Sequence, residues 1–197
     1  MARGEERPAA AALRRARNLR ATRREASECA LMLMLYAGYP SALEGLRLLN
    51  RVWPGEAAAT REGSRETWRR RGEALCRRVY GPAYARLLPA VRALHPDLAV
   101  WMVEQGYGRV LARPGLAVLD RELITVAALA ALGWERQLVS HVLGAARVGA
   151  TAAAVRAALA SGSRHAPRSA RGMIARTWRR AAPLLAKTDR SAAGAAR

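Results

Sequence analysis

Apolar residues recur every three or four positions along most of the chain, which is the spacing of one face of an α-helix. No stretch shows the strict apolar and polar alternation of a half-buried strand. From Glu25, the segment EASECALMLMLYA carries such a helical stripe, and the residues Gly38-Tyr-Pro40 then break it. The pattern predicts an all-α fold.

Further helices follow from the same periodicity and from its interruptions. Gly81-Pro82 ends one helix, His95-Pro96-Asp97 opens another, and Gly133 joins two more. The expected segments are Ser41–Val52, Arg65–Tyr80, Tyr84–Leu94, His95 to about Tyr107, Val118–Leu132, Glu135–Val148, Thr151–Leu159 and an amphipathic stretch around Met173–Leu185. Because the connections are short, we expect antiparallel neighbours in one helical bundle.

The composition divides the 197 residues into one domain and two basic tails. Residues 1–24 are rich in Arg and carry a net charge of +6, and we expect this tail to be mobile. Residues 25–161 form the predicted helical domain, with a net charge of only +5. Residues 162–197, rich in Ala and Arg, carry +8 and are expected to be helical in part.

The net charge of +19 raises the question of a nucleic-acid partner. Arg69-Arg-Arg71 and Arg77-Arg78 can share one face of a long helix, yet a solvated face or an inter-subunit salt-bridge surface would look the same. Lys187 is the only lysine, and an excess of Arg beside abundant Ala is also what codon bias produces. Nucleic acid is therefore an alternative partner and not the favoured one.

Other sequence features bear on location and on metal binding. No apolar run reaches the roughly 18 residues of a membrane span, and the first residues lack the apolar core of a signal peptide. We expect a soluble, cytoplasmic protein, although the Arg-rich start also weakly resembles an organellar presequence. Cys29 and Cys76 lie far apart and form no Cys-x-x-Cys pair, so no zinc ribbon or disulfide scaffold is expected, and no metal.

Glu122 and His141 are the residues best placed for proton transfer. His141 projects from an apolar stripe with Leu138 and Ala145, and Glu122 borders one with Val126. Each alone is more typical of a structural residue. Because the turn at Gly133 folds the two helices together, however, we expect direct or one-water contact between the two side chains, which makes acid–base chemistry possible.

The stretch from Arg113-Pro-Gly-Leu116 through Arg121-Glu-Leu-Ile124, Leu129-Ala-Ala-Leu-Gly133 and His141 to Thr151 resembles the carboxymuconolactone decarboxylase family, which includes alkyl hydroperoxidase D-like proteins. The resemblance implies an alkyl hydroperoxidase D-like bundle of about seven to nine helices and a homo-oligomer, either a dimer, a trimer or a hexamer. In the hydroperoxidase branch, a Glu is followed at +12 and +15 by redox cysteines and at +19 by a His. Here Glu122 and His141 keep that spacing, but Trp134 and Gln137 replace the cysteines.

The order of the motifs also departs from the family. Its helix with a Tyr-x-Gly-x-Pro ending normally follows the Gly-x-Thr helix, whereas Tyr36-Ala-Gly-Tyr-Pro40 precedes every other motif in this chain. A circular permutation accounts for the change, since permutation is tolerated where termini lie close together. It requires residues 36–40 to pack beside the 113–141 unit.

The favoured function is a cofactor-free decarboxylase-like lyase acting on a small anionic substrate, a carboxylated lactone or a keto acid. His141 would deliver the proton and Glu122 would orient it. The candidate substrate-binding residues are the carboxylate clamps Arg113 and Arg121 and the pocket residues Tyr36 and Trp134. Three alternatives stay open: the family's thiol peroxidase activity, a non-catalytic oligomeric binding protein, and a nucleic-acid-associated protein using the Arg-rich tails.

Overall fold

The computed structural model describes residues 5–57 and 63–195, with side chains up to residue 186. Every regular element in these residues is helical, which confirms the all-α prediction. The α-helices are α1 (Glu6–Asn18), α2 (Arg23–Val52), α3 (Arg65–Tyr80), α4 (Tyr84–Leu94), α5 (Pro96–Trp101), α6 (Val118–Leu132), α7 (Glu135–Arg147), α8 (Ala152–Ser163) and α9 (Arg171–Ala195). A π-helical segment, η2 (Met102–Leu111), continues from α5, and short 3₁₀ turns, Gly81–Ala83 and Arg168–Ala170, precede α4 and α9.

Helix α2 is two helices joined at the expected break. Gly38 has φ 80° and ψ 170°, a conformation open to glycine and costly for other residues, and Pro40 follows within the same kink. At its start, the Thr22 side chain accepts a hydrogen bond from the Glu25 backbone N–H, and the Glu25 carboxylate accepts one from the Thr22 N–H. This capping box fixes the beginning of the helix.

The segment after His95 differs from the expected helix. It begins as expected at Pro96, but it runs to Leu111 and changes to π-helical hydrogen bonding at Met102. The reason is its very close packing on α3. A Cβ atom at Gly72 would lie 2.0 Å from the Val103 carbonyl oxygen, and one at Gly108 would lie 1.9 Å from that of Trp68. The two backbones therefore touch through glycines, and the π turns fit η2 to this surface.

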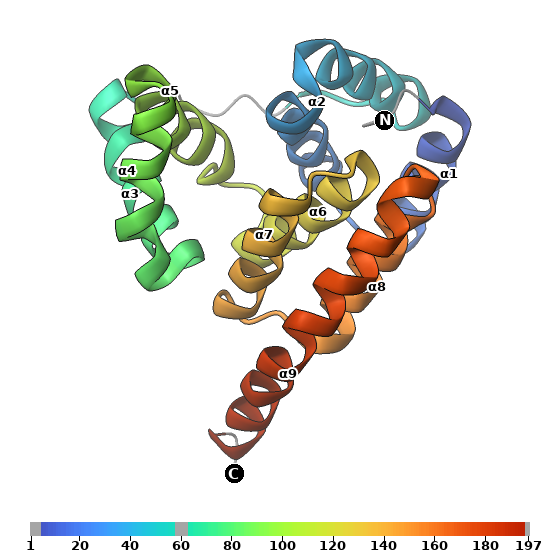
Figure 1. The fold of residues 1–197 in the computed structure, drawn as a ribbon. Helices are drawn as coiled ribbons and strands as arrows, with labels where there is room; N and C mark the ends of the chain where they lie inside the picture. Colours follow the sequence, from blue (N-terminus) through green and yellow to red (C-terminus); the bar gives the residue numbers. More distant parts are fainter. Residues whose placement is uncertain (1–4, 58–62, 196–197) are drawn as a thin grey trace.

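Helices α6 and α7 occupy the centre of the molecule (Figure 1). In this view, α3, α4 and α5 lie on one side of them and α8 and α9 on the other. One group of buried residues comes from α6, α7, α8 and α9. A second group comes mainly from α2, α3 and η2. Tyr36 packs against both groups. The core thus has two parts that meet where α2 passes α6.

Both terminal segments contain helices that pack on the domain. Helix α1, within the Arg-rich N-terminal segment, packs against α2, although none of its residues is buried. Helix α9 is longer than the expected amphipathic stretch and contributes Met173, Ile174 and Leu185 to the core. Residue 161, the expected end of the domain, lies inside α8. The division of the chain into a domain at residues 25–161 and two basic tails remains a prediction.

Candidate functional site

Glu122 and His141 form a buried hydrogen-bonded pair. Gly133, in the left-handed conformation at φ 80° and ψ 25°, ends α6 and turns the chain into α7. The turn brings His141 Nδ1 to 2.9 Å from Glu122 Oε2, and the two residues are 7% and 2% exposed. The close approach expected from the sequence is confirmed.

Space for the Glu122 carboxylate depends on a glycine one turn beyond His141. A Cβ atom at Gly144 would lie 2.8 Å from Glu122 Oε2 and 2.6 Å from Val79 Cγ1. The absence of a side chain at this position therefore lets the carboxylate lie between α6 and α7, close to the end of α3.

The geometry assigns different roles to the two partners. An ionised carboxylate can only accept hydrogen bonds, so the His141 Nδ1–H donates to Glu122, and Nε2 is the nitrogen left to exchange a proton with another molecule. The side chain of His141 is 8% exposed against 3% for Glu122. The imidazole is thus the more accessible side chain of the pair, and the more deeply buried carboxylate fixes its orientation through the hydrogen bond to Nδ1.

Two tyrosines beside this pair were not identified from the sequence. The rings of Tyr80 and His141 meet edge to face, with centroids 6.1 Å apart. The Tyr107 hydroxyl donates to the Tyr80 hydroxyl over 2.5 Å, and burial raises the pKa of both phenols, which stay protonated. In the sequence, both residues look like ordinary members of apolar helical stripes, so no local signal marked them.

Tyr36 is brought to the same region by α2. Thr125 Oγ1 donates to the Arg121 carbonyl oxygen at 2.8 Å, so the Tyr36 hydroxyl is the donor to Thr125 Oγ1 at 2.5 Å. This contact places the N-terminal part of α2 against α6, as the permutation hypothesis requires. Tyr39, on the other side of the kink, is 65% exposed.

The other candidate pocket residue, Trp134, lies in a different place. It precedes the first turn of α7 and is 56% exposed. Seven positions separate it from His141, which corresponds to about two helical turns. In the described structure, Trp134 therefore lies at the start of α7, about two turns before His141, and its side chain is largely exposed.

Arg113 and Arg121 bind a carboxylate from α2 that the sequence analysis did not identify. Arg121 Nη2 donates to Glu28 Oε2 at 3.0 Å, and Arg113 Nε lies 3.1 Å from the same oxygen. Arg121 Nη2 also donates to the Arg113 carbonyl oxygen at 2.9 Å, and its Nη1 is buried with no hydrogen-bond partner among the described residues. The two arginines thus fasten α2 to the loop before α6.

A large cavity of the described structure lies away from these residues. It measures about 830 Å³ and is bounded by α1, α2, α6 and α8. On α6 it is lined by Asp120, Leu123, Ile124 and Ala127, which point away from the Glu122 face. The acid–base pair and this cavity thus occupy opposite sides of one helix.

Neither cysteine is suited to peroxide chemistry. Cys76 is fully buried, and burial raises its pKa to about 12, while burial also raises the pKa of Cys29. Both are free thiols. Trp134 and Gln137, where the hydroperoxidase branch has its cysteines, are exposed at the start of α7 and carry no thiol.

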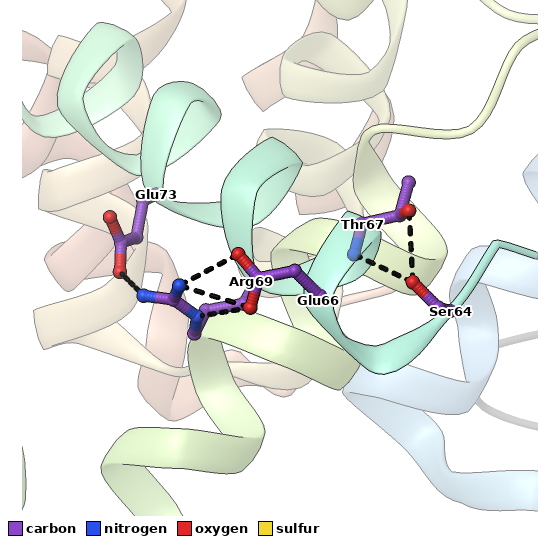
Figure 2. Close-up of polar contacts among 5 residues, drawn as sticks. All are labelled: Ser64, Glu66, Thr67, Arg69 and Glu73. Atoms are coloured by element: carbon purple, nitrogen blue, oxygen red, sulfur yellow. Dashed lines mark hydrogen bonds and ion pairs between the residues drawn. The ribbon is translucent and has the colours of Figure 1, made fainter.

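The arginines of α3 that suggested a nucleic-acid surface are partly engaged within the chain. Figure 2 shows Arg69 between Glu66 and Glu73, with the nearest carboxylate oxygens at 2.8 Å and 3.4 Å. Arg77 stacks over the Tyr84 ring at 5.5 Å. Intramolecular contacts therefore account for part of this basic face.

Two features are absent from the described residues. None of their helices is both long and apolar enough to cross a membrane. Within the same residues, no three His, Cys, Asp or Glu side chains gather as they would around a metal ion.

The helical segment that carries the buried pair is similar to a known protein family. The model of the carboxymuconolactone decarboxylase family matches residues 96–165, so this segment resembles members of that family. The matched range runs from α5 beyond α8 and includes both Glu122 and His141. No curated protein and no solved structure matches the chain.

Proposed function

We propose that Glu122 and His141 are the acid–base pair of a cofactor-free, decarboxylase-like lyase. The observation that carries the proposal is their 2.9 Å contact inside the segment that matches the family. A buried imidazole held by a carboxylate is suited to proton transfer, because burial excludes competing water and the hydrogen bond fixes the ring.

The substrate is a small carboxylated lactone or keto acid. In the reaction, the carbon–carbon bond to the substrate carboxylate breaks and CO₂ leaves. The electron pair stays on the substrate, where an adjacent carbonyl group accepts it as an enolate. The imidazolium of His141 then gives its Nε2 proton to the carbon, and the Glu122 carboxylate stabilises the imidazolium before that transfer.

A substrate carboxylate also requires a cation. Arg113 is the better of the two arginine candidates, because its side chain is 19% exposed against 2% for Arg121. If Arg113 turned to the substrate, Glu28 would keep Arg121 as its partner. Release of Arg121 would instead leave a charge unpaired in the core, which is costly.

The thiol peroxidase alternative has less support. It requires a thiolate near the histidine, and burial favours the protonated thiol at both Cys29 and Cys76. A non-catalytic binding protein would need neither member of the pair.

A screen for CO₂ release tests the proposal. Purified protein is incubated with carboxylated lactones and β-keto acids, beside the variants His141→Ala and Glu122→Gln. We expect His141→Ala to lower kcat by about 10²- to 10⁴-fold, the usual contribution of a general acid. Ser140→Ala is the matched control, since Ser140 is the preceding residue and its hydroxyl donates to the Arg136 carbonyl oxygen, away from the pair. A substrate that His141→Ala decarboxylates at the full rate would refute the assignment.

A further inference from the structure

The 830 Å³ cavity between α1 and the body of the domain has the dimensions of a ligand site. Small-molecule sites usually measure about 300–1,000 Å³ and are mostly apolar. The wall of this cavity is formed by Leu13, Leu33, Leu49, Leu123 and Ile124, together with alanines of α1, α2 and α6. It lies on the side of α6 opposite Glu122, so it is a separate site from the acid–base pair.

Residues along the whole length of α1 line the cavity, from Glu5 to Arg20. Pro8 and Glu5 from the start of α1 line one end with Ser161 and His165 of α8 and the turn after it, while Arg20 lines the other end with Asp120 of α6. The 13 residues of α1 correspond to about 20 Å of helix. A mostly apolar space lined over this length fits a chain better than a compact ring.

Helix α1 is held at its ends and has small side chains in between. The carboxylate of Glu5 lies 2.8 Å from His165 Nδ1, and Arg17 stacks over the Trp53 ring at 5.9 Å. Between these points the cavity-facing residues include Ala9, Ala12 and Ala16. Alanines do not fill the space beneath the helix, which is why the cavity persists under a covered surface.

The two ends of the cavity differ in charge. At one end the side chains of Glu5 and His165 form a hydrogen bond with each other. At the other, Glu25 is occupied by the capping box with Thr22, and Asp120 lies in the first turn of α6, where the helix dipole favours a carboxylate. Arg20 forms no ion pair with another described residue, so beside these two carboxylates its guanidinium is the cation that a ligand carboxylate can contact.

From these observations we infer that the cavity binds a linear, apolar carboxylic acid of medium length. The chain lies beneath α1 against the leucines and alanines, and the carboxylate faces Arg20. This site needs neither Glu122 nor His141, and the inference does not depend on the proposed lyase activity.

Calorimetric titration of the full chain with dodecanoate, below its micellar concentration, tests the inference. Two neighbouring residues of α1 provide a matched pair, since Ala12 lines the cavity and Ala11 does not, while both are exposed. We expect saturable binding to the unmodified protein, a loss of roughly tenfold or more in Ala12→Trp, which overfills the space, and little change in Ala11→Trp. Glu122→Gln should bind dodecanoate like the unmodified protein.

The head-group contact has its own pair of variants. Arg20→Gln should weaken dodecanoate by up to about fivefold, as expected for an exposed ion pair, and Arg15→Gln on the outer side of α1 should not. Dodecyltrimethylammonium, which carries the opposite charge, should bind more weakly than dodecanoate to the unmodified protein. Equal binding of the two amphiphiles would overturn the assignment of the carboxylate end.

A second readout does not depend on the folding of any variant. Cys29 lines the cavity and Cys76 is fully buried elsewhere, so alkylation of the native protein by N-ethylmaleimide reports on Cys29. Dodecanoate should slow this reaction in proportion to its occupancy. Absence of saturable binding, equal affinity of Ala11→Trp and Ala12→Trp, or unchanged alkylation of Cys29 at saturating dodecanoate would each refute the site.

Discussion

The carboxylate of Glu28 on α2 lies 3.0 Å from Arg121 Nη2 on α6, although 93 residues separate them along the chain. Arg113 contacts the same carboxylate. The side chains of Glu28 and Arg121 are 3% and 2% exposed, so this ion pair belongs to the core. The ion pair connects α2, whose Tyr36–Pro40 motif departs from the family order, with the segment that matches the family.

Removal of the Glu28 charge should strongly destabilise the fold. Glu28→Gln leaves Arg121 buried without a counter-charge, and breaking a buried pair in this way costs about 3–5 kcal/mol. Chemical denaturation measures the change. The matched control is Glu44→Gln, since Glu44 and Arg47 form an exposed pair on the same helix, whose loss should change the free energy of unfolding by less than about 1 kcal/mol. Equal effects of the two variants would show that the buried network contributes little.

Gly144 should tolerate no side chain without cost to the acid–base pair. In Gly144→Ala, the new methyl group would meet Glu122 Oε2 and Val79 Cγ1 at distances below 3 Å. We expect a loss of about 1–3 kcal/mol in stability, the usual cost of overpacking, and a displaced Glu122 carboxylate. Gly149→Ala is not a suitable control because of its positive φ, whereas Gly172→Ala in α9 adds a methyl group with only Arg176 Nη1 nearby, at 3.5 Å. Denaturation and the NMR shifts of the His141 ring distinguish the two changes.

Local signals predicted much of the helical framework. Gly81-Pro82 ends α3 and Gly133 ends α6, and each signal acts through the residue's own backbone conformation. The contact between Glu122 and His141 could be predicted because both residues follow the periodicity of adjacent helices. The sequence therefore identified the central pair of the candidate site.

Features that depend on distant contacts could not be predicted in this way. The π-helical η2 results from backbone contact with α3 through Gly72 and Gly108, which no local pattern encodes. Glu28 stands in an apolar stripe, and its partners lie 85 and 93 residues away. The cavity under α1 likewise depends on how that helix docks, and periodicity contains no information about docking.

Alkaline pH should destabilise the protein partly through Cys76. An unfolded thiol loses its proton near its ordinary pKa of 9.0, whereas burial keeps the folded thiol protonated up to about pH 12. Between these values the unfolded state binds fewer protons, so the free energy of unfolding falls as pH rises, by at most about 1.4 kcal/mol per pH unit for one group. The buried tyrosines act in the same direction at higher pH.

Urea denaturation between about pH 8 and about pH 10, under reducing conditions, measures this effect. We expect the stability of Cys76→Ala to depend less steeply on pH than that of the unmodified protein. Cys29→Ala shows what the loss of the other thiol does under the same conditions. Identical slopes for Cys76→Ala and the unmodified protein would show that Cys76 titrates normally in the folded state.

The chain should have no dithiol-dependent peroxidase activity. Turnover of alkyl hydroperoxides by thiol chemistry requires a thiolate nucleophile and a resolving thiol, and a raised pKa keeps Cys29 and Cys76 protonated at neutral pH. Cumene hydroperoxide consumption in the presence of a dithiol reductant should therefore equal the protein-free rate. Cys29→Ser and Cys76→Ala should leave decarboxylation by the proposed pair largely intact, since an imidazole delivers a proton without any thiol. Peroxide turnover that disappears on replacement of either cysteine would instead support the thiol peroxidase alternative.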